Sequence, residues 1–243
     1  MRSVVIVNGY EMNLDVSECI QGKMASGSYE PVQTSWVREH LKQGERFVDV
    51  GASFGYYTSL ASQIVRNTGR VFSFEPSPIA CGTIRDTISR NGITNIELSC
   101  SAVGNECGEI DILLPPDNNL HSPSVFESGE GFTPRMVTVV SIDSNEYLND
   151  GKPIDMIKID VEGYEPNVIQ GMEKLISTRL VKMIMCEFNS GWLSRNNGMT
   201  AGRLVWIIKS FGYRVLAQTD KVLAIERDGA TPYELQDILF VRV

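Results

Sequence analysis

The sequence predicts an α/β fold in which a mostly parallel β-sheet carries helices on both faces. From Arg46 onward, short runs of β-branched and aromatic residues alternate with helical stretches, the pattern of parallel βα units. The 243 residues suffice for one such domain, and the contents of 42% apolar and 21% charged residues are those of a folded globular protein. We therefore expect one compact unit at residues 46–243, preceded by an N-terminal cap at residues 1–45.

The N-terminal cap is expected to consist of a hairpin and a helix. Two strand-like runs flank Asn8-Gly9, a pair that readily takes positive φ at both central positions of a turn, so residues 3–16 are predicted to form a β-hairpin. Pro31 suits the first position of a helix, and Gly44 follows as a stop.

The alternating region then defines the sheet. Parallel strands are expected at residues 47–50, 71–74, 96–100, 156–159 and 182–186. Helices are expected at residues 55–66, 77–91, 166–177 and 200–211. Ser77 is the predicted N-cap of the second helix, with Pro78 at its first position, and Gly212 ends the last. Strands at 213–217, 222–225 and 238–243 have only loops between them, which predicts an antiparallel pair at the end of the sheet.

One region interrupts the alternation. Residues 109–114 and 136–142 read as strands, and a polar segment joins them. A loop of about 20 residues without structure of its own is uncommon and tends to be functional or disordered. Residues 115–135 are therefore a candidate lid on the substrate side.

Charge and cysteine content narrow the classes of partner and compartment. The net charge of −8 and a pI near 4.9 oppose binding to nucleic acid or anionic membranes, so we expect no nucleic-acid partner. Five cysteines without a C-x-x-C pair indicate neither a disulfide framework nor a thiolate zinc site, which favours the cytoplasm. The N-terminal apolar run is too short for a signal peptide, and no run approaches the roughly 20 apolar residues of a transmembrane segment.

A glycine turn follows the first strand of the predicted sheet. Residues 49–55 leave a buried-looking strand and open a helix, so their backbone N–H groups are expected to point at a ligand. The dinucleotide fingerprint is missing, because Ser53 and Tyr56 occupy its second and third glycine positions counted from Gly51. Asp49 suits a cationic ligand better than a pyrophosphate. S-adenosylmethionine (SAM) is such a ligand, since it carries an ammonium and a sulfonium and no phosphate.

Glu75 ends the next predicted strand, 24 positions after Gly51. A carboxylate at this place can accept hydrogen bonds from both ribose hydroxyls of a nucleoside. NAD sites use the same device, so only the combination with Asp49 and the glycine turn favours SAM. A tight strand-to-helix turn also explains the glycines without any ligand.

Acidic residues recur at two later strand ends. Asp160 and Glu162 close one strand and Glu187 the next, which predicts that three carboxylates converge in the crevice where a methyl acceptor would lie. Capping of helices or pairing with Lys158 would explain them as well. Clustered carboxylates also suit Mg²⁺, but no spacing requires a metal, and we expect none. His121, in the candidate lid, is a possible general base or simply an exposed histidine.

Several motifs together give the sequence a resemblance to the FkbM family of SAM-dependent methyltransferases, over about residues 14–187. The matching segments are Gly27-Ser28-Tyr29-Glu30-Pro31, Phe47-Val48-Asp49-Val50-Gly51-Ala52, Gly55-Tyr56-Tyr57-Thr58, Phe74-Glu75-Pro76-Ser77-Pro78, Asn91-Gly92, Ala102-Val103-Gly104, Ile157-Lys158-Ile159-Asp160-Val161-Glu162-Gly163, Glu165 and Glu187. Residues 53–54 depart from the asparagine and aliphatic residue that the family more often has, and residues 115–135 align with nothing in it.

This resemblance implies a class I SAM-methyltransferase fold, which is Rossmann-like, with a seven-stranded sheet whose last strand is antiparallel. By position, it places Asp49, Gly51 and Gly55 along the methionine part of SAM, Glu75 at the ribose, and Ser101 and Ala102 beside the adenine. The cofactor-binding candidates are Glu30, Asp49, Gly51, Ala52, Ser53, Gly55, Tyr56, Glu75, Pro76, Ser101, Ala102 and Asp160.

The expected function is therefore SAM-dependent O-methylation of a hydroxyl on a sugar, glycan or secondary metabolite. Candidates for the catalytic groups are Asp160, Glu162, His121 and Glu187. The alternatives are a nicotinamide-dependent oxidoreductase, which the missing fingerprint opposes, an RNA 2′-O-methyltransferase, which the acidic balance opposes, and a SAM-binding protein without catalysis. The oligomeric state stays open, with a homodimer as one alternative.

Overall fold

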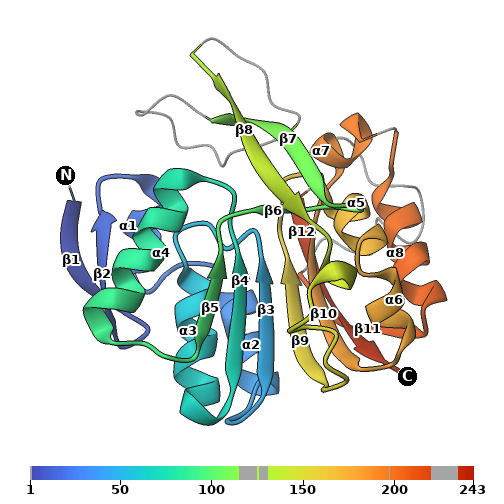
Figure 1. The fold of residues 1–243 in the computed structure, drawn as a ribbon, viewed down its shortest axis with the longest axis horizontal. Helices are drawn as coiled ribbons and strands as arrows, with labels where there is room; N and C mark the ends of the chain where they lie inside the picture. Colours follow the sequence, from blue (N-terminus) through green and yellow to red (C-terminus); the bar gives the residue numbers. More distant parts are fainter. Residues whose placement is uncertain (1, 115–124, 126–130, 197, 220–234) are drawn as a thin grey trace.

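The computed structural model describes residues 2–114, 125, 131–196, 198–219 and 235–243. Its centre is a seven-stranded sheet in the order β11-β12-β10-β9-β3-β4-β5 (Figure 1). β12 is antiparallel to both of its neighbours, whereas β10, β9, β3, β4 and β5 are mutually parallel, so the predicted fold class is confirmed. The strands are β3 (Arg46–Val50), β4 (Arg70–Phe74), β5 (Ile96–Ser99), β9 (Ile154–Ile159), β10 (Val181–Asn189), β11 (Tyr213–Gln218) and β12 (Leu235–Arg242). The predicted strand at 222–225 lies outside the described residues.

Side chains alternate between the two faces of this sheet and form two apolar clusters. Phe47, Met156, Met185 and Leu239 share one cluster with α2 (Pro31–His40) and α3 (Tyr56–Val65). Their sequence neighbours Val48, Ile157, Ile184 and Ile238 share the other with α5 (Glu165–Gln170), α6 (Glu173–Ser177) and α8 (Ala201–Ser210). Helices thus cover both faces, as predicted. In the described residues, no helix has the length and apolar character needed to cross a membrane.

Most predicted helix ends are confirmed. Ser77 caps α4 (Pro78–Asn91) by accepting a hydrogen bond from the Ala80 amide, and Gly212 follows α8 with φ +85°. The single helix predicted at 166–177 is wrong, because α5 and α6 are separated there. The carbonyl of Gly171 accepts hydrogen bonds from Asp143 N and Ser141 Oγ, and a Cβ on Gly171 would lie 1.9 Å from the Gly104 carbonyl oxygen. In a continuous helix the Gly171 carbonyl would accept from the Leu175 amide, which instead donates to Asp143 Oδ1, so the helix is interrupted.

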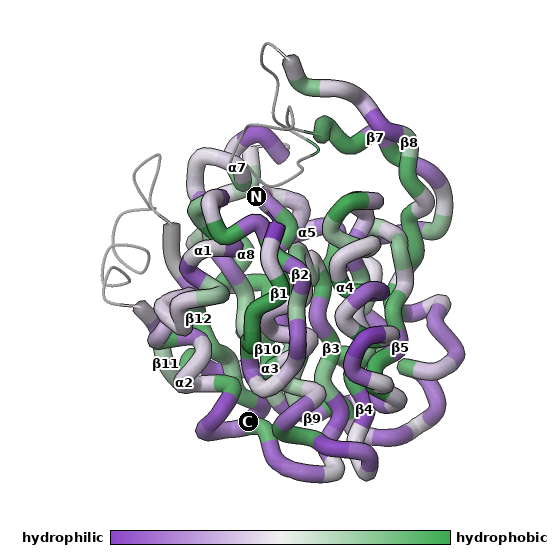
Figure 2. The backbone as a smooth tube through the Cα atoms, turned by 90° about the vertical axis from the view of Figure 1, so that its left-hand side faces the viewer, coloured by the Kyte–Doolittle hydropathy of each residue, from purple (hydrophilic) through white to green (hydrophobic). Residues whose placement is uncertain are grey.

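The N-terminal segment packs against the main sheet through apolar side chains. β1 (Arg2–Val7) and β2 (Tyr10–Asp15) pair around Asn8-Gly9, which has φ values of +51° and +83°, so the hairpin is confirmed. Figure 2 shows it beside α3 and α4, and its buried side chains belong to the cluster of Phe47. α1 (Cys19–Ser26) was not predicted; Glu18, an uncommon N-cap residue, accepts hydrogen bonds from two of its first amides.

A small second sheet stands beside the C-terminal end of β5. It consists of β6 (Ala102–Val103), β8 (Thr133–Val140) and β7 (Gly108–Leu114), so both strands of the interrupting region are confirmed with shifted ends. Of the candidate lid, residues 133–135 belong to β8, and 115–124 and 126–130 lie outside the described residues. The remaining elements are η1 (Arg66–Thr68), η2 (Ile142–Ser144) and α7 (Ser190–Arg195).

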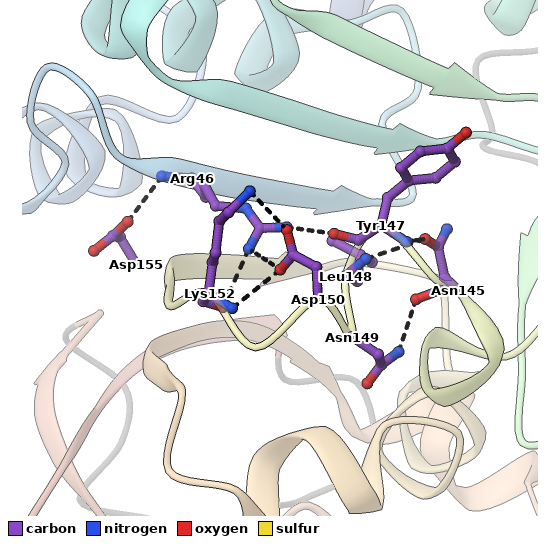
Figure 3. A network of polar contacts seen from close by, with 8 residues as sticks. All are labelled: Arg46, Asn145, Tyr147, Leu148, Asn149, Asp150, Lys152 and Asp155. Atoms are coloured by element: carbon purple, nitrogen blue, oxygen red, sulfur yellow. Dashed lines mark hydrogen bonds and ion pairs between the residues drawn. The ribbon is translucent and has the colours of Figure 1, made fainter.

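Arg46, the first residue of β3, holds the end of the sheet where the parallel strands begin (Figure 3). Its guanidinium donates to Asp150 Oδ1 at 2.9 Å and to two backbone carbonyls of the loop before β9, and its amide donates to Asp155 at 2.8 Å. These contacts hold β3 and β9 in register at the end of the sheet remote from the glycine turn.

Cys81 and Cys100 form a disulfide, a pairing that the cysteine pattern did not predict. α4 packs against β5, and this packing brings the two Cα atoms to 5.9 Å, within the range for a disulfide. Their sequence separation of 19 gave no local signal for this pairing.

We expect protein isolated without reductant and then denatured to alkylate at three thiols, Cys19, Cys107 and Cys186, and at five after reduction. The loop entropy of such a crosslink corresponds to about 3 kcal/mol, so reduction should also lower the melting temperature. Intact-mass spectrometry and thermal unfolding with and without reductant measure both effects. Five alkylated thiols in the unreduced protein would contradict the pairing.

Candidate active site

The character of one sheet face changes from apolar to charged toward the carboxyl ends of the strands. Phe47 is followed on this face by Asp49, Met156 by Lys158, and Met185 by Glu187. The register sets Asp49 beside Lys158, and Glu187 beside Asp237 of β12. α2 and α3 cover this face, so these ionisable groups lie between the sheet and the two helices.

A cavity of about 960 Å³ opens at this edge. Its volume is at the upper end of the range typical of small-molecule and cofactor sites. Ten of the predicted site residues line it: Glu30, Gly51, Ser53, Glu75, Pro76, Ser101, Ala102, Asp160, Glu162 and Glu187. Asp49, Ala52, Gly55 and Tyr56 are not among its lining residues, and His121 lies outside the described part of the chain.

The glycine turn is shaped by its contact with the next strand. Gly51 has φ +82°, and a Cβ at this position would lie 1.8 Å from the carbonyl oxygen of Asp160. The expectation that the turn's amides point at a ligand is wrong for three of them: those of Gly51 and Ala52 donate to the Phe74 carbonyl, and that of Gly55 to the Ala52 carbonyl. Phe74 is the last residue of β4, and its carbonyl holds the amides of Gly51 and Ala52 against the sheet. The turn therefore contributes to the cavity wall through the course of its backbone.

Glu75 connects the turn to the start of α4. Its Oε2 accepts a hydrogen bond from Ser53 N and its Oε1 from Ser77 N, both at 2.7 Å. The side chain is 4% exposed, and burial raises the pKa of Glu75 to about 7 against the opposing effect of these amides. Each oxygen keeps a further lone pair, so the carboxylate can still accept two hydroxyl donors from the cavity.

Asp49 lies behind the cavity wall. Its Oδ2 accepts a 2.6 Å hydrogen bond from the Thr58 hydroxyl, and within the described part of the chain its Oδ1 has no hydrogen-bond partner. Burial raises the pKa of this carboxyl, although Lys158 attracts its negative charge. Asp49 thus acts on the cavity through its field and through Lys158, without a direct contact across the wall.

Lys158 is a buried cation among these acids. Its Nζ lies 2.7 Å from Asp160 Oδ2 and 4.9 Å from the centre of the Tyr57 ring. Burial alone would lower the pKa of Lys158, but Asp160, Glu30 and Asp49 outweigh burial and raise it above its usual range. Asp160 is therefore the ion-pair partner of Lys158, as the alternative explanation of this acid expected. It also lines the cavity.

Glu30 reaches the cavity from the N-terminal segment. It is the N-cap of α2, with φ +40°, and its carboxylate accepts a 2.7 Å hydrogen bond from the Tyr57 hydroxyl. The first residues around α1, including Asp15, Glu18 and Lys23, line the same cavity and were missed. Nothing in their local sequence distinguishes them from an ordinary polar turn and helix.

The three later acids come together as predicted. One carboxylate oxygen from each of Asp160, Glu162 and Glu187 lies within 4.8 Å of the other two. Glu162 has φ +53°, and Glu165, another residue that we missed as a candidate, holds this loop by accepting hydrogen bonds from the amides of residues 161 and 163. Burial raises the pKa of Glu165 to about 8.

The seven-stranded sheet with antiparallel β12, with a cavity at the carboxyl ends of its parallel strands, is the fold of class I SAM-dependent methyltransferases. The solved structure of SMU.1697c from Streptococcus mutans, in complex with S-adenosylhomocysteine, is similar with a TM-score of 0.50 at 9% identity, over 87% of this chain and 96% of that one. Residues 49–215 match the Methyltransferase FkbM domain. The chain belongs to this family.

Two curated relatives are methyltransferases. The hexuronic acid methyltransferase AglP of Haloferax volcanii is 26% identical over 158 residues, which are 63% of this chain and 59% of that protein. Methyltransferase sdnD of Sordaria araneosa is 29% identical over 168 residues, 56% of this chain and 63% of that protein. The matched regions thus cover less than two thirds of the length of either relative.

Proposed function

We propose that this protein transfers the methyl group of SAM to a hydroxyl oxygen of a sugar, glycan or secondary metabolite. The observation that carries the proposal is the convergence of ten predicted residues, from the N-terminal segment and five strand ends, on one acidic cavity. The name of AglP favours a sugar acid or related sugar as the acceptor class.

The cofactor end of the cavity fits a cationic nucleoside. In this proposal Glu75 accepts hydrogen bonds from the two ribose hydroxyls, which is supported by the lone pairs that its oxygens keep beside the Ser53 and Ser77 amides. Ser101 and Ala102, at the start of β6, would flank the adenine, and Glu30 adds negative charge near the methionine part. SAM supplies there a methyl carbon made electrophilic by the positive sulfur.

The acceptor end is formed by the three carboxylates. Lys158 donates a hydrogen bond to one oxygen of Asp160, which fixes the orientation of that carboxylate at the cavity wall. We assign Asp160 as the group that receives the hydroxyl proton, with Glu162 and Glu187 beside it. Apolar lining residues, among them Phe54, Ile112 and Val161, exclude water and help to align the acceptor oxygen with the methyl carbon. His121 remains a further candidate base.

The direct test is transfer of a labelled methyl group from SAM to a panel of hexuronic acids, other sugars, glycolipids and polyketides. We expect label on a hydroxyl oxygen of at least one sugar class, located by mass spectrometry of the product. Calorimetry with SAM and with NAD separates the cofactor classes. Binding of NAD without binding of SAM would contradict the proposal.

The affinity for SAM is expected to rise with pH across about pH 7. Glu75 must be ionised to accept from both ribose hydroxyls, and its pKa of about 7 leaves it partly protonated in the free protein. The same raised pKa means that Glu75 contributes stability to the free protein below about pH 4.5, and that this contribution is lost as the pH rises toward 7. Glu75→Gln should weaken SAM binding about 10- to 100-fold at pH 8 and flatten its pH dependence.

Calorimetric titration at pH 6, 7 and 8 measures this effect, and Asp237→Asn is the matched control. Burial raises the pKa of Asp237 to about 7 as well, but Asp237 does not line the cavity. The assignment of Glu75 is wrong if Glu75→Gln keeps the pH dependence and Asp237→Asn loses it.

A further inference from the structure

We propose that Asp160, Glu162 and Glu187 bind a hard divalent cation of the Mg²⁺ or Ca²⁺ class, and that this cation holds an acceptor with two neighbouring oxygen atoms. The part concerning the acceptor rests on the proposed function. The cation site itself rests on the geometry of the three carboxylates, which replaces the expectation from sequence that no metal is bound.

The spacing of the three oxygens suits such an ion. Three oxygens spread evenly around one ion are about 1.7 metal–oxygen distances apart, which is about 3.6 Å for Mg²⁺ and about 4.0 to 4.5 Å for Ca²⁺. The three carboxylate oxygens lie within 4.8 Å of one another without an ion, so Ca²⁺ needs the smaller movement of these side chains and Mg²⁺ the larger. The donors are all carboxylate oxygens, the ligands that both ions prefer.

Glu187 provides a second, independent observation. It is 9% exposed and lines the cavity, yet its buried Oε2 has no hydrogen-bond partner among the described residues. A buried carboxylate oxygen left without a partner is costly, because it has lost its hydration without replacement. A cation among the three acids would give this carboxylate a positively charged partner.

The charges around the cluster also require compensation. Asp160, Glu162 and Glu187 approach one another while Lys158, the buried cation beside them, is already paired with Asp160 through the oxygen Oδ2. The negative charges of Glu30 and Asp49 also attract Lys158. Lys158 therefore interacts with several carboxylates at once, and a divalent cation would reduce the repulsion among the three acids.

A cation held by three carboxylates keeps coordination positions for the acceptor, since these ions take at least six oxygen ligands. Two neighbouring oxygens on one molecule, such as a vicinal diol or the hydroxyl and carboxylate of a sugar acid, would occupy two of these positions together. This chelation would fix which hydroxyl lies at the cavity centre. It would also let a strongly acidic site bind an acidic acceptor.

Binding is tested with Mn²⁺, followed by electron paramagnetic resonance on chelator-treated protein without SAM or acceptor, with Mg²⁺ and Ca²⁺ as competitors. We expect one class of site, displaced by either ion, and at least a tenfold loss of affinity in Glu187→Gln and in Glu162→Gln. Glu39→Gln, which removes an exposed carboxylate on α2, is the control and should bind as the wild type does. Both site variants neutralise crowded carboxylates, so their melting temperatures should equal or exceed that of the wild type.

The site is disproved if the wild type retains no Mn²⁺, or if the two variants bind it unchanged; a proton shared among the acids would then relieve the repulsion. Methyl transfer assayed with chelator and with added Mg²⁺ separates this inference from the proposed function. Full transfer in chelator would overturn the cation's role while the proposed function stands. Mn²⁺ binding that needs Glu187, in a protein that transfers no methyl group, would support the site and overturn the proposed function.

Discussion

Gly51→Ala is expected to abolish SAM binding and to destabilise the protein by about 3 kcal/mol or more. The new Cβ would lie 1.8 Å from the Asp160 carbonyl oxygen, which belongs to the backbone and cannot move away as a flexible side chain can. The φ of +82° adds strain for any residue with a Cβ. Removing this clash requires β3 and β9 to move apart beside Asp160, where it lines the cavity. The substitution therefore disturbs the fold and the binding site together.

Gly92→Ala is the matched control for this substitution. Gly92 also has positive φ, +58°, as the C-cap of α4, but a Cβ there would meet no atom of the residues that the structure describes within 4 Å. We expect a loss of about 1 kcal/mol and unchanged SAM affinity. Thermal unfolding and calorimetry compare the two variants. Equal effects in both would show that backbone conformation, and not the contact with Asp160, is what matters at Gly51.

Asp160→Asn is expected to lower the rate of methyl transfer about 10²- to 10⁴-fold, the usual contribution of a positioned acid or base, with little change in SAM affinity. The amide keeps the size of the side chain but removes the charge that faces the cavity and pairs with Lys158 at 2.7 Å. Single-turnover kinetics at saturating SAM measure the effect. An unchanged rate would remove Asp160 from the catalytic role.

Loss of the buried ion pair is a separate effect of the same substitution, and a second variant isolates it. Lys158 is 3% exposed, so leaving it without Asp160 should cost stability as well as activity. The double variant Lys158→Met with Asp160→Asn removes the stranded cation. We expect it to recover much of the melting temperature and none of the rate. Recovery of the rate would mean that Asp160 serves only to neutralise Lys158.

The sequence determined the elements with local signals. Alternation of apolar residues, helix caps such as Ser77 and turn pairs such as Asn8-Gly9 act within a few residues, and the structure contains the elements that they predicted. The acids at 160, 162 and 187 were found because the carboxyl ends of parallel strands must meet at one edge of the sheet. The same topology rule gave the location of the cavity.

The tertiary structure alone decided which of these residues face the cavity. Asp49 and Glu75 both looked like acids near the end of a strand, yet α3 covers Asp49 with Thr58, while Glu75 lies beyond the end of β4 on the cavity wall. The Cys81–Cys100 pair and the place of Glu30 beside Tyr57 likewise depend on how separate segments pack. A local pattern states which side chains share a face of a strand. What covers that face is fixed only by contacts between residues far apart in the chain, and burial and charge follow from those contacts.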